Sequence, residues 1–553
     1  MRAIQGAIGM AANGVNLDAL IPREDLAVGD GLVTGDQGGA KVEMVHLRDK
    51  FWAGQLRKPE FQRETVQWSP PKIVDLVSAF LDRQLIPAVI LWHAGQLNFV
   101  VDGAHRLSAL LAWIYDDYGD GDRSRRLFGQ VIPPEQLAIA NKTRKLIEGK
   151  IGKSILFEAG LDYPDTVTDL QRTRISNMSV AHLVAQWVPA VKARDAEDSF
   201  FKINDAATPL DATEKRILQS RDSASAIAAR AISHGGKGYS YWRQFEEEIR
   251  RVIEQYSARI FGLLYKPPLA DGPIDTLDVP VAGRGYSVLP FVFDLVNTIN
   301  DPKVADSTGK GSKDKLAKDI GGDQTVKYLK AVQRTVQRIT GKEPMSLGLH
   351  PVVYFYTKGG AFSPWSFLAW SKIVDDLFER HKVNRFCDIR CELEEYLIDH
   401  KWAMTEIVHQ HGSGHRSTPW LERYWRFVVG ELMAGKTTAQ VVAAVPDQSG
   451  FGFLRSKSPV IRVASENSDR RISASTRTAA IWDAALPGSA CCPICNSRYH
   501  RNSIHGDHRT AKRDGGDGRP SNTDITHPYC DSTYKDWKAA RSARQASSAA
   551  PVG

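Results

Sequence analysis

Cysteine is scarce in this sequence, and long apolar runs are absent from it. Six cysteines in 553 residues are too few for a disulfide framework. Four of them lie at positions 491, 492, 495 and 530, which favours metal binding in a reducing compartment, so we expect a cytoplasmic protein. No stretch is apolar enough for a signal peptide or a membrane span. No repeat at solenoid periods is visible.

Positive charge gathers at the C-terminal end of the chain. Residues 451–553 hold 16 Lys and Arg against 9 Asp and Glu, whereas the net charge of the whole chain is +8. A basic segment favours a polyanionic partner, because each phosphate contact releases counterions. A solvated basic tail that only aids solubility would have the same composition, so charge alone does not decide between the two.

Two pairs of metal-ligand residues lie in this basic segment. Two residues separate Cys492 from Cys495, and two separate His527 from Cys530. Such gaps let both side chains of a pair reach one tetrahedral ion, so the four residues predict a structural zinc site. Cys491 is an alternative to Cys492, although the two-residue gap favours Cys492.

The residues between the two pairs carry polar groups that a structural zinc does not need. Phosphodiester hydrolysis requires a base, a divalent metal and contacts that hold the nucleic-acid backbone. His508 is the candidate base at the end of a hairpin expected over residues 497–508, and Asp507 is a hard oxygen ligand for Mg²⁺ or Mn²⁺. Asn522 can ligate this metal or fix its loop. The candidate phosphate contacts are Lys512, Arg513 and Arg519.

Residues 480–540 resemble the HNH endonuclease family, the ββα-metal nucleases with an added zinc clamp. The matching residues are Cys492/Cys495, Asp507-His508, Gly515-Gly516, Asn522 and His527/Cys530. Three departures are visible: His527 replaces a cysteine, Asp531 stands where Asn or His is usual, and Lys535 lies one residue late. The resemblance implies a metal-dependent DNA endonuclease, with Asp531 as a further ligand of the catalytic metal. A zinc ribbon that binds DNA without cutting it is the alternative.

Residues 46–130 predict a unit of helices and strands. Pro70-Pro71 suits the first turn of a helix. Residues 88–92 and 98–101 have the composition of strands, and a tight turn at Asp102-Gly103 leads into a second helix. A strand-to-helix turn favours phosphate, because a helix N-terminus presents free N–H groups.

The stretches PEFQRETVQW and VVDGAHRLSALLAW resemble the ParB-like nucleotide-binding fold, in the branch found in GmrSD-type restriction proteins (domain-of-unknown-function family 262). Ala104-His105 stands where this branch usually has two Gln. The resemblance covers residues 50–230 and implies binding of a nucleoside triphosphate, GTP or another, with hydrolysis left open. The implied nucleotide-site residues are Gln62, Arg63, Asp102, Gly103, His105, Arg106 and Asn204. The alternative is an Asp102–Arg106 ion pair that only caps the helix.

We therefore expect an α+β multidomain protein with a ParB-like α/β domain, a mostly α-helical middle and a C-terminal ββα-metal module. The expected segments are a leader (1–45), the nucleotide-binding domain (46–240), a helical domain (241–445), a basic linker (446–480), the nuclease module (481–540) and a disordered tail (541–553). The leader is expected to be loose, with a short helix at residues 17–20. The expected partners are DNA, with modified phage DNA as one form, and a nucleoside triphosphate that gates cutting. A non-cleaving, nucleotide-switched DNA-binding regulator is the rival function. The oligomeric state stays open, a homo-oligomer included.

Overall fold

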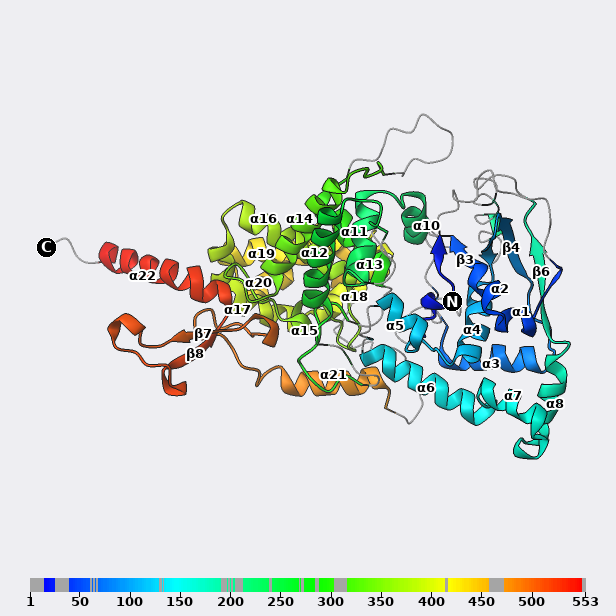
Figure 1. Ribbon diagram of the computed structural model, residues 1–553. Helices are drawn as coiled ribbons and strands as arrows, with labels where there is room; N and C mark the ends of the chain where they lie inside the picture. Colours follow the sequence, from blue (N-terminus) through cyan, green and yellow to red (C-terminus); the bar gives the residue numbers. More distant parts are fainter. Residues whose placement is uncertain are drawn as a thin grey trace. The chain divides into compact units, whose positions relative to one another are not determined.

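The computed structural model divides the chain into two compact units (Figure 1). The N-terminal unit comprises Met1–Arg221, Lys237–Tyr241 and Ser307–Lys315, and the C-terminal unit comprises the rest. The residues that the structure describes are 14–24, 39–59, 62, 65, 68–128, 132, 134–189, 196, 199, 202–203, 212–237, 241–267, 269, 273–283, 288–302, 316–412, 416–456 and 472–549.

A mixed six-stranded sheet organises the N-terminal unit, in the order β1-β3-β5-β4-β6-β2. The pairs β1·β3, β3·β5 and β4·β6 are parallel, whereas β4·β5 and β2·β6 are antiparallel. The strands are β1 (Arg23–Glu24), β2 (Lys41–Glu43), β3 (Leu56–Pro59), β4 (Val89–Ala94), β5 (Leu97–Asp102) and β6 (His182–Trp187). The two strands predicted between residues 88 and 101 are confirmed as the central hairpin, β4 and β5.

The helices of this unit include α3, which begins at the predicted Pro70, and α4, which follows β5 directly. Gly103 makes the turn into α4 with φ +96°, and a Cβ there would lie 2.7 Å from Cγ1 of Val89. Only glycine meets both conditions without strain. The helices are α1 (Met44–Arg48), α2 (Lys50–Gln55), α3 (Pro70–Leu81), α4 (Ala104–Tyr115), α5 (Asp122–Phe128), α6 (Pro134–Lys150), α7 (Ser154–Asp162), α8 (Asp169–Met178) and α10 (Ala212–Gln219).

The segment expected as a loose leader supplies both edges of the sheet. β1 lies at one edge and β2 at the other. The chain before β1 also buries apolar side chains in the core, namely Val15, Leu17, Leu20 and Ile21. The short helix expected at residues 17–20 is present as a 3-10 helix over Asp18–Leu20, whereas the expectation that the rest of this segment is loose is wrong for the described residues. Strands of two and three residues are too short to produce a periodic pattern.

Asp18 is a buried carboxylate that ties the chain before β1 to the sheet. Its oxygens accept hydrogen bonds from Arg23 Nη2 at 2.8 Å, Lys58 Nζ at 2.7 Å and the Thr65 amide at 3.1 Å. Burial raises the pKa of Asp18, but the charges of Arg23 and Lys58 outweigh it and lower this pKa far below its ordinary value.

We expect Asp18→Asn to lower the free energy of unfolding of the N-terminal unit by about 3–5 kcal/mol, because two buried cations lose their partner. Because the pKa of Asp18 is lower in the folded than in the unfolded state, its carboxylate stabilises the fold above the unfolded-state pKa. The difference in unfolding free energy between wild type and Asp18→Asn therefore narrows as pH falls below about 4. Urea unfolding at pH 7 and pH 3 measures both effects. Asp116→Asn, which breaks a surface pair with Arg144, is the control, and equal losses in the two variants would contradict the expectation.

Helices form the body of the C-terminal unit, as the apolar spacing of its sequence predicts. α11 packs against α13, α12 against α14, and α16 against α19. The helices are α11 (Ala224–Ser233), α12 (Glu247–Tyr265), α13 (Val288–Asn300), α14 (Asp323–Ile339), α15 (Pro351–Tyr354), α16 (Pro364–Glu379), α17 (Val383–Asp399), α18 (Lys401–His411), α19 (Thr418–Met433), α20 (Thr438–Ala444), α21 (Ala474–Ala485) and α22 (Lys535–Ala549). Within the described ranges, no helix has the length and apolarity needed to cross a membrane.

Two of these helices lie where the sequence predicted irregular chain. α21 covers the end of the expected basic linker, and α22 continues through the expected disordered tail as far as Ala549. The Ser473 side chain caps α21, and Trp482 on this helix is buried. The linker was predicted from its Arg and Pro content, which does not reflect a helix cap or one buried aromatic side chain.

Candidate metal centre and active site

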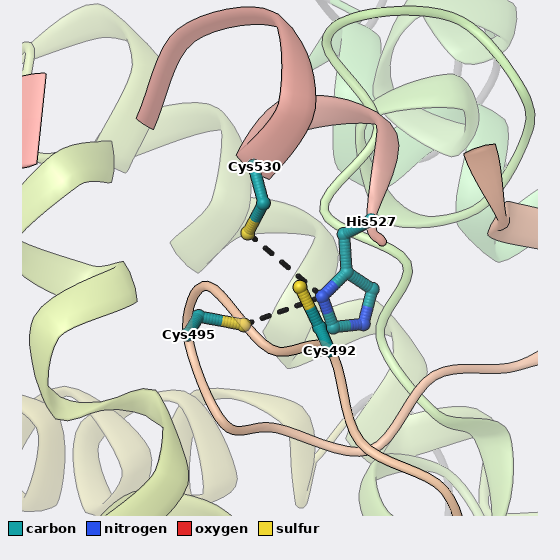
Figure 2. Close-up of side chains that lie close together, drawn as sticks. All are labelled: Cys492, Cys495, His527 and Cys530. Atoms are coloured by element: carbon teal, nitrogen blue, oxygen red, sulfur yellow. Dashed lines mark hydrogen bonds between the residues drawn. The ribbon is translucent and has the colours of Figure 1, made fainter. Parts of the chain in front are cut away.

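Cys492, Cys495, His527 and Cys530 converge on one buried point, with their side chains directed toward one another (Figure 2). Their ligand atoms lie within 4.8 Å of one another. His527 Nδ1 lies 3.3 Å from the Cys495 Sγ and 3.9 Å from the Cys530 Sγ. The four residues that the sequence predicts as zinc ligands therefore form a Cys3His group that can bind a metal such as zinc.

The cysteine thiols of this group shift one another's pKa in opposite directions. Hydrogen bonds with Cys495 and Cys530 lower the pKa of the Cys492 thiol far below its ordinary value, whereas the hydrogen bond with Cys492 raises the pKa of Cys495. The protein groups alone thus favour only one thiolate, and a Zn²⁺ ion would allow all three thiols to lose their protons. Burial lowers the pKa of His527 and keeps its imidazole in the neutral, ligating form.

Helix α17 supports this group through a chain of hydrogen bonds. When His527 Nδ1 ligates a metal, its Nε2 carries the proton and donates to the Arg498 carbonyl, 3.1 Å away. The Arg498 amide donates to Glu394 at 2.8 Å, and Glu394 pairs with Arg390 at 2.9 Å. Neither side chain of this pair is exposed. Sequence reasoning missed Arg390 and Glu394, since an i,i+4 pair of opposite charge is common on exposed helices.

Further contacts fasten the C-terminal segment to the helical body. Ser503 Oγ accepts a hydrogen bond from the Gly341 amide at 2.8 Å, and the Tyr534 hydroxyl donates to Asp388 at 2.7 Å. The Ser532 hydroxyl donates to the Pro344 carbonyl at 2.7 Å. The helical body therefore anchors the metal group, the segment around Ser503 and the residues just before α22.

The hairpin expected within residues 497–508 is wrong. β7 (His505–His508) instead pairs antiparallel with β8 (Thr523–Thr526), across a loop of residues 509–522. Asp507 lies opposite Asp524, and His508 lies opposite Thr523. The segment before β7 binds the helical body through Ser503 and is not available as a pairing strand. His508 still ends a strand, as predicted.

Asp507 and Asp531 converge on the ammonium group of Lys535. Lys535 Nζ lies 3.1 and 3.0 Å from the two oxygens of Asp507 and 2.6 Å from Asp531 Oδ1. The other Asp531 oxygen lies 3.4 Å from His505 Nδ1. Burial raises the pKa of Asp531, but Lys535 outweighs it and the pKa is lowered. Sequence reasoning missed His505, although it lies two residues before Asp507 and therefore on the same face of β7.

A π-turn over Cys530–Tyr534 precedes α22. A π-turn holds one residue more than an α-turn, and such turns are frequent at functional sites. It leads directly into Lys535, whose ammonium group contacts Asp507 and Asp531.

Asn522 has the contacts of a residue that fixes its loop. Its Oδ1 accepts from the Thr510 amide at 2.8 Å, and its Nδ2 donates to the Asp517 carbonyl at 2.7 Å. Gly516 lies against the same segment, where a Cβ would be 1.7 Å from the Thr510 carbonyl oxygen. His508 is half-buried, and its ring has no hydrogen bond or ion pair within the described residues.

The three candidate phosphate contacts all lie on the exposed loop between β7 and β8. Arg513 lies 3.7 Å from Asp514, and Arg519 lies 3.2 Å from Asp517. Exposed ion pairs of this kind contribute little, so both arginines can exchange their partners for phosphate. Lys512 is exposed at the start of the same turn.

In the N-terminal unit, the ion pair considered as an alternative is present. Arg106 Nη2 lies 2.6 Å from Asp102 Oδ2 and donates to the Ala88 carbonyl at 3.0 Å. This pair joins the end of β5 to the first turn of α4. Asp102 and Arg106 thus have a structural role at the turn where nucleotide binding is expected.

The other nucleotide-site candidates lie around the same turn where the structure describes them. Gln62 is only 8% exposed, and its Nε2 donates to the Val101 carbonyl at 3.4 Å, which places it beside the end of β5. The Gln62 Oε1 is buried with no partner among the described residues. The His105 ring stacks on Trp68, with ring centroids 5.5 Å apart. Arg63 and Asn204 lie outside the described residues.

Comparison with known proteins identifies a family whose model matches part of the chain. Residues 46–219 match the family model described as the GmrSD restriction endonuclease, N-terminal domain. No curated protein and no solved structure is significantly similar to the chain. The matched range contains strands β3 to β6 and the turn at Gly103. Residues 46–219 are therefore similar to the N-terminal domain of the GmrSD restriction endonuclease.

Proposed function

We propose that this chain is a metal-dependent DNA endonuclease of the HNH type, gated by nucleotide binding to a ParB-like N-terminal domain. The observation that carries the proposal is that the carboxylates of Asp507 and Asp531 converge. His508 directly follows Asp507 in β7, and the turn that carries Asp531 begins at Cys530 of the Cys3His group. The family match of residues 46–219 to a restriction endonuclease domain supports DNA as the substrate and phage restriction as the role. Unpaired thiols outside the Cys3His group favour the reducing cytoplasm.

Each residue of the C-terminal site has a defined task in this proposal. Asp507 and Asp531 offer hard oxygen ligands that fit Mg²⁺ or Mn²⁺. Such an ion, when bound, would stabilise negative charge on the phosphate. His508 accepts the proton of the attacking water. Asn522 keeps the loop after β7 in position. The loop cations hold the DNA backbone: Lys512, Arg513 and Arg519.

A nicking assay tests the proposal. Supercoiled plasmid, unmodified phage DNA and modified phage DNA are incubated with the full chain and Mg²⁺ or Mn²⁺, with and without each nucleoside triphosphate. We expect cutting that requires the divalent ion and changes with one nucleotide. DNA that is bound but stays intact under every condition would show a non-cleaving regulator instead.

We expect Arg106→Ala to weaken nucleoside triphosphate binding by about tenfold or more and to leave the zinc content unchanged. The substitution removes a cation from the first turn of α4 and leaves the Asp102 carboxylate unpaired, where it repels phosphate. Isothermal titration with GTP and ATP measures the affinity. Arg144→Ala, which also removes an aspartate-paired arginine of this unit, is the matched control. An unchanged affinity in Arg106→Ala would exclude Arg106 from the site.

A further inference from the structure

We propose that Lys535 is a built-in counter-ion, which occupies the two metal-ligand carboxylates until a DNA phosphate draws its ammonium group away. This inference rests on the proposed nuclease function, because Asp507 and Asp531 are its metal ligands. It adds a regulatory step to that function: the divalent ion binds strongly only when DNA is present.

The geometry sets the ammonium group and a divalent ion in competition. Lys535 Nζ contacts both oxygens of Asp507 and one oxygen of Asp531. A divalent ion would bind these same oxygens at about 2.0–2.6 Å. An ammonium group and a divalent cation that share three oxygens repel each other strongly, so one must leave before the other binds.

The pairing of the surrounding charges makes Lys535 the cation that neutralises Asp507. Asp524, which faces Asp507 across the hairpin, is already paired with Arg509 at 2.7 Å. Asp531 has a second partner in His505, at 3.4 Å. Among the described residues, Asp507 has Lys535 as its cationic partner. Departure of Lys535 therefore leaves Asp507 with an uncompensated charge that a divalent ion would neutralise.

Lys535 is able to move without rearrangement of the fold. Its side chain is 38% exposed and begins at the first residue of α22, so the flexible four-carbon stem can turn away while the helix stays in place. A phosphodiester carries the negative charge that would attract the ammonium group. By linkage, DNA that removes Lys535 from the carboxylates strengthens metal binding, and bound metal strengthens DNA binding by the same factor.

Mn²⁺ binding to the zinc-loaded full chain tests the proposal without any cleavage. All proteins carry His508→Ala so that DNA stays intact, and free Mn²⁺ is followed by electron paramagnetic resonance. We expect Lys535→Met to bind Mn²⁺ at least about tenfold more tightly than its parent in the absence of DNA. The matched control is Lys538→Met, which removes the same charge one turn later on α22, where Lys538 contacts the Ile494 carbonyl. It should bind Mn²⁺ like the parent.

A short DNA duplex supplies the second arm of the experiment. It should tighten Mn²⁺ binding by the parent and have little further effect on Lys535→Met. Parent and Lys535→Met with equal Mn²⁺ affinities would overturn the counter-ion role. Asp507→Asn separates the two hypotheses. If it loses the Mn²⁺ site while Lys535→Met gains nothing, the nuclease proposal stands and this inference fails. If it binds Mn²⁺ like the parent, both are wrong.

Discussion

His508→Ala should reduce DNA cleavage by a factor of about 10²–10⁴, which is what a positioned general base contributes. His508 ends β7 next to Asp507, and within the described residues no partner holds its ring, so the imidazole is available to accept a proton from water. The substitution removes no hydrogen bond that supports the fold. Zinc content and thermal stability should therefore stay at wild-type values.

The plasmid nicking rate, measured under single-turnover conditions, checks this expectation. His409→Ala, which changes an exposed histidine of α18, is the control for loss of a histidine elsewhere in the same unit. Cleavage by His508→Ala at the wild-type rate would assign the base to another residue. Cleavage lost equally in both variants would point to damage of the C-terminal unit as a whole.

Cys492→Ser should release the zinc ion and abolish cleavage, whereas the adjacent Cys491→Ser should do neither. Cys492 is fully buried within the Cys3His group, and Cys491 is an exposed thiol outside it. Structural zinc contributes an apparent binding free energy of about 10–16 kcal/mol in small zinc-finger peptides. We therefore expect the segment around the Cys3His group to unfold when this binding free energy is lost. The turn that begins at Cys530 carries Asp531 and leads directly into Lys535, so the Lys535–Asp507 contact depends on this segment.

Metal analysis by atomic absorption and thermal unfolding of the two variants measure these effects. We expect one zinc per chain in wild type and Cys491→Ser, and a lower unfolding temperature for Cys492→Ser alone. Treatment of wild type with a strong chelator should reproduce the variant. Full zinc content in Cys492→Ser would show that Cys491 takes its place, the alternative that the sequence left open.

The parts of the site that were predictable from sequence are those set by local spacing. Two-residue gaps position Cys492 with Cys495 and His527 with Cys530, whatever lies between the pairs. The turn at Gly103 was predictable for the same reason, because a glycine between a strand and a helix determines the local backbone. The roles assigned to Asp507 and His508 from local chemistry stay predictions.

The parts that were not predictable depend on contacts between distant residues. The pairing of β7 was predicted wrongly because Ser503 binds Gly341, which lies 162 residues away. The strand β1 depends on Asp18 reaching Lys58, and two residues of strand carry no pattern of their own. Lys535 was noted only as a departure in spacing. Its contact with Asp507 joins residues 28 positions apart, and a π-turn that the sequence does not mark lies directly before it.

The buried attachment between α17 and the metal group limits how the proposed nuclease could be controlled. Glu394 accepts a hydrogen bond from the Arg498 amide and Asp388 from the Tyr534 hydroxyl, so the proposed nuclease segment packs on the helices and is not a separate domain on a linker. Swinging it away from the helices would expose a charged pair that has no water around it, at a cost of several kcal/mol. Excising residues 481–549 for use in a chimera would leave the same surfaces uncovered. In the proposed nuclease, control would therefore act on access to the carboxylates of Asp507 and Asp531, without movement of the helices on which they rest.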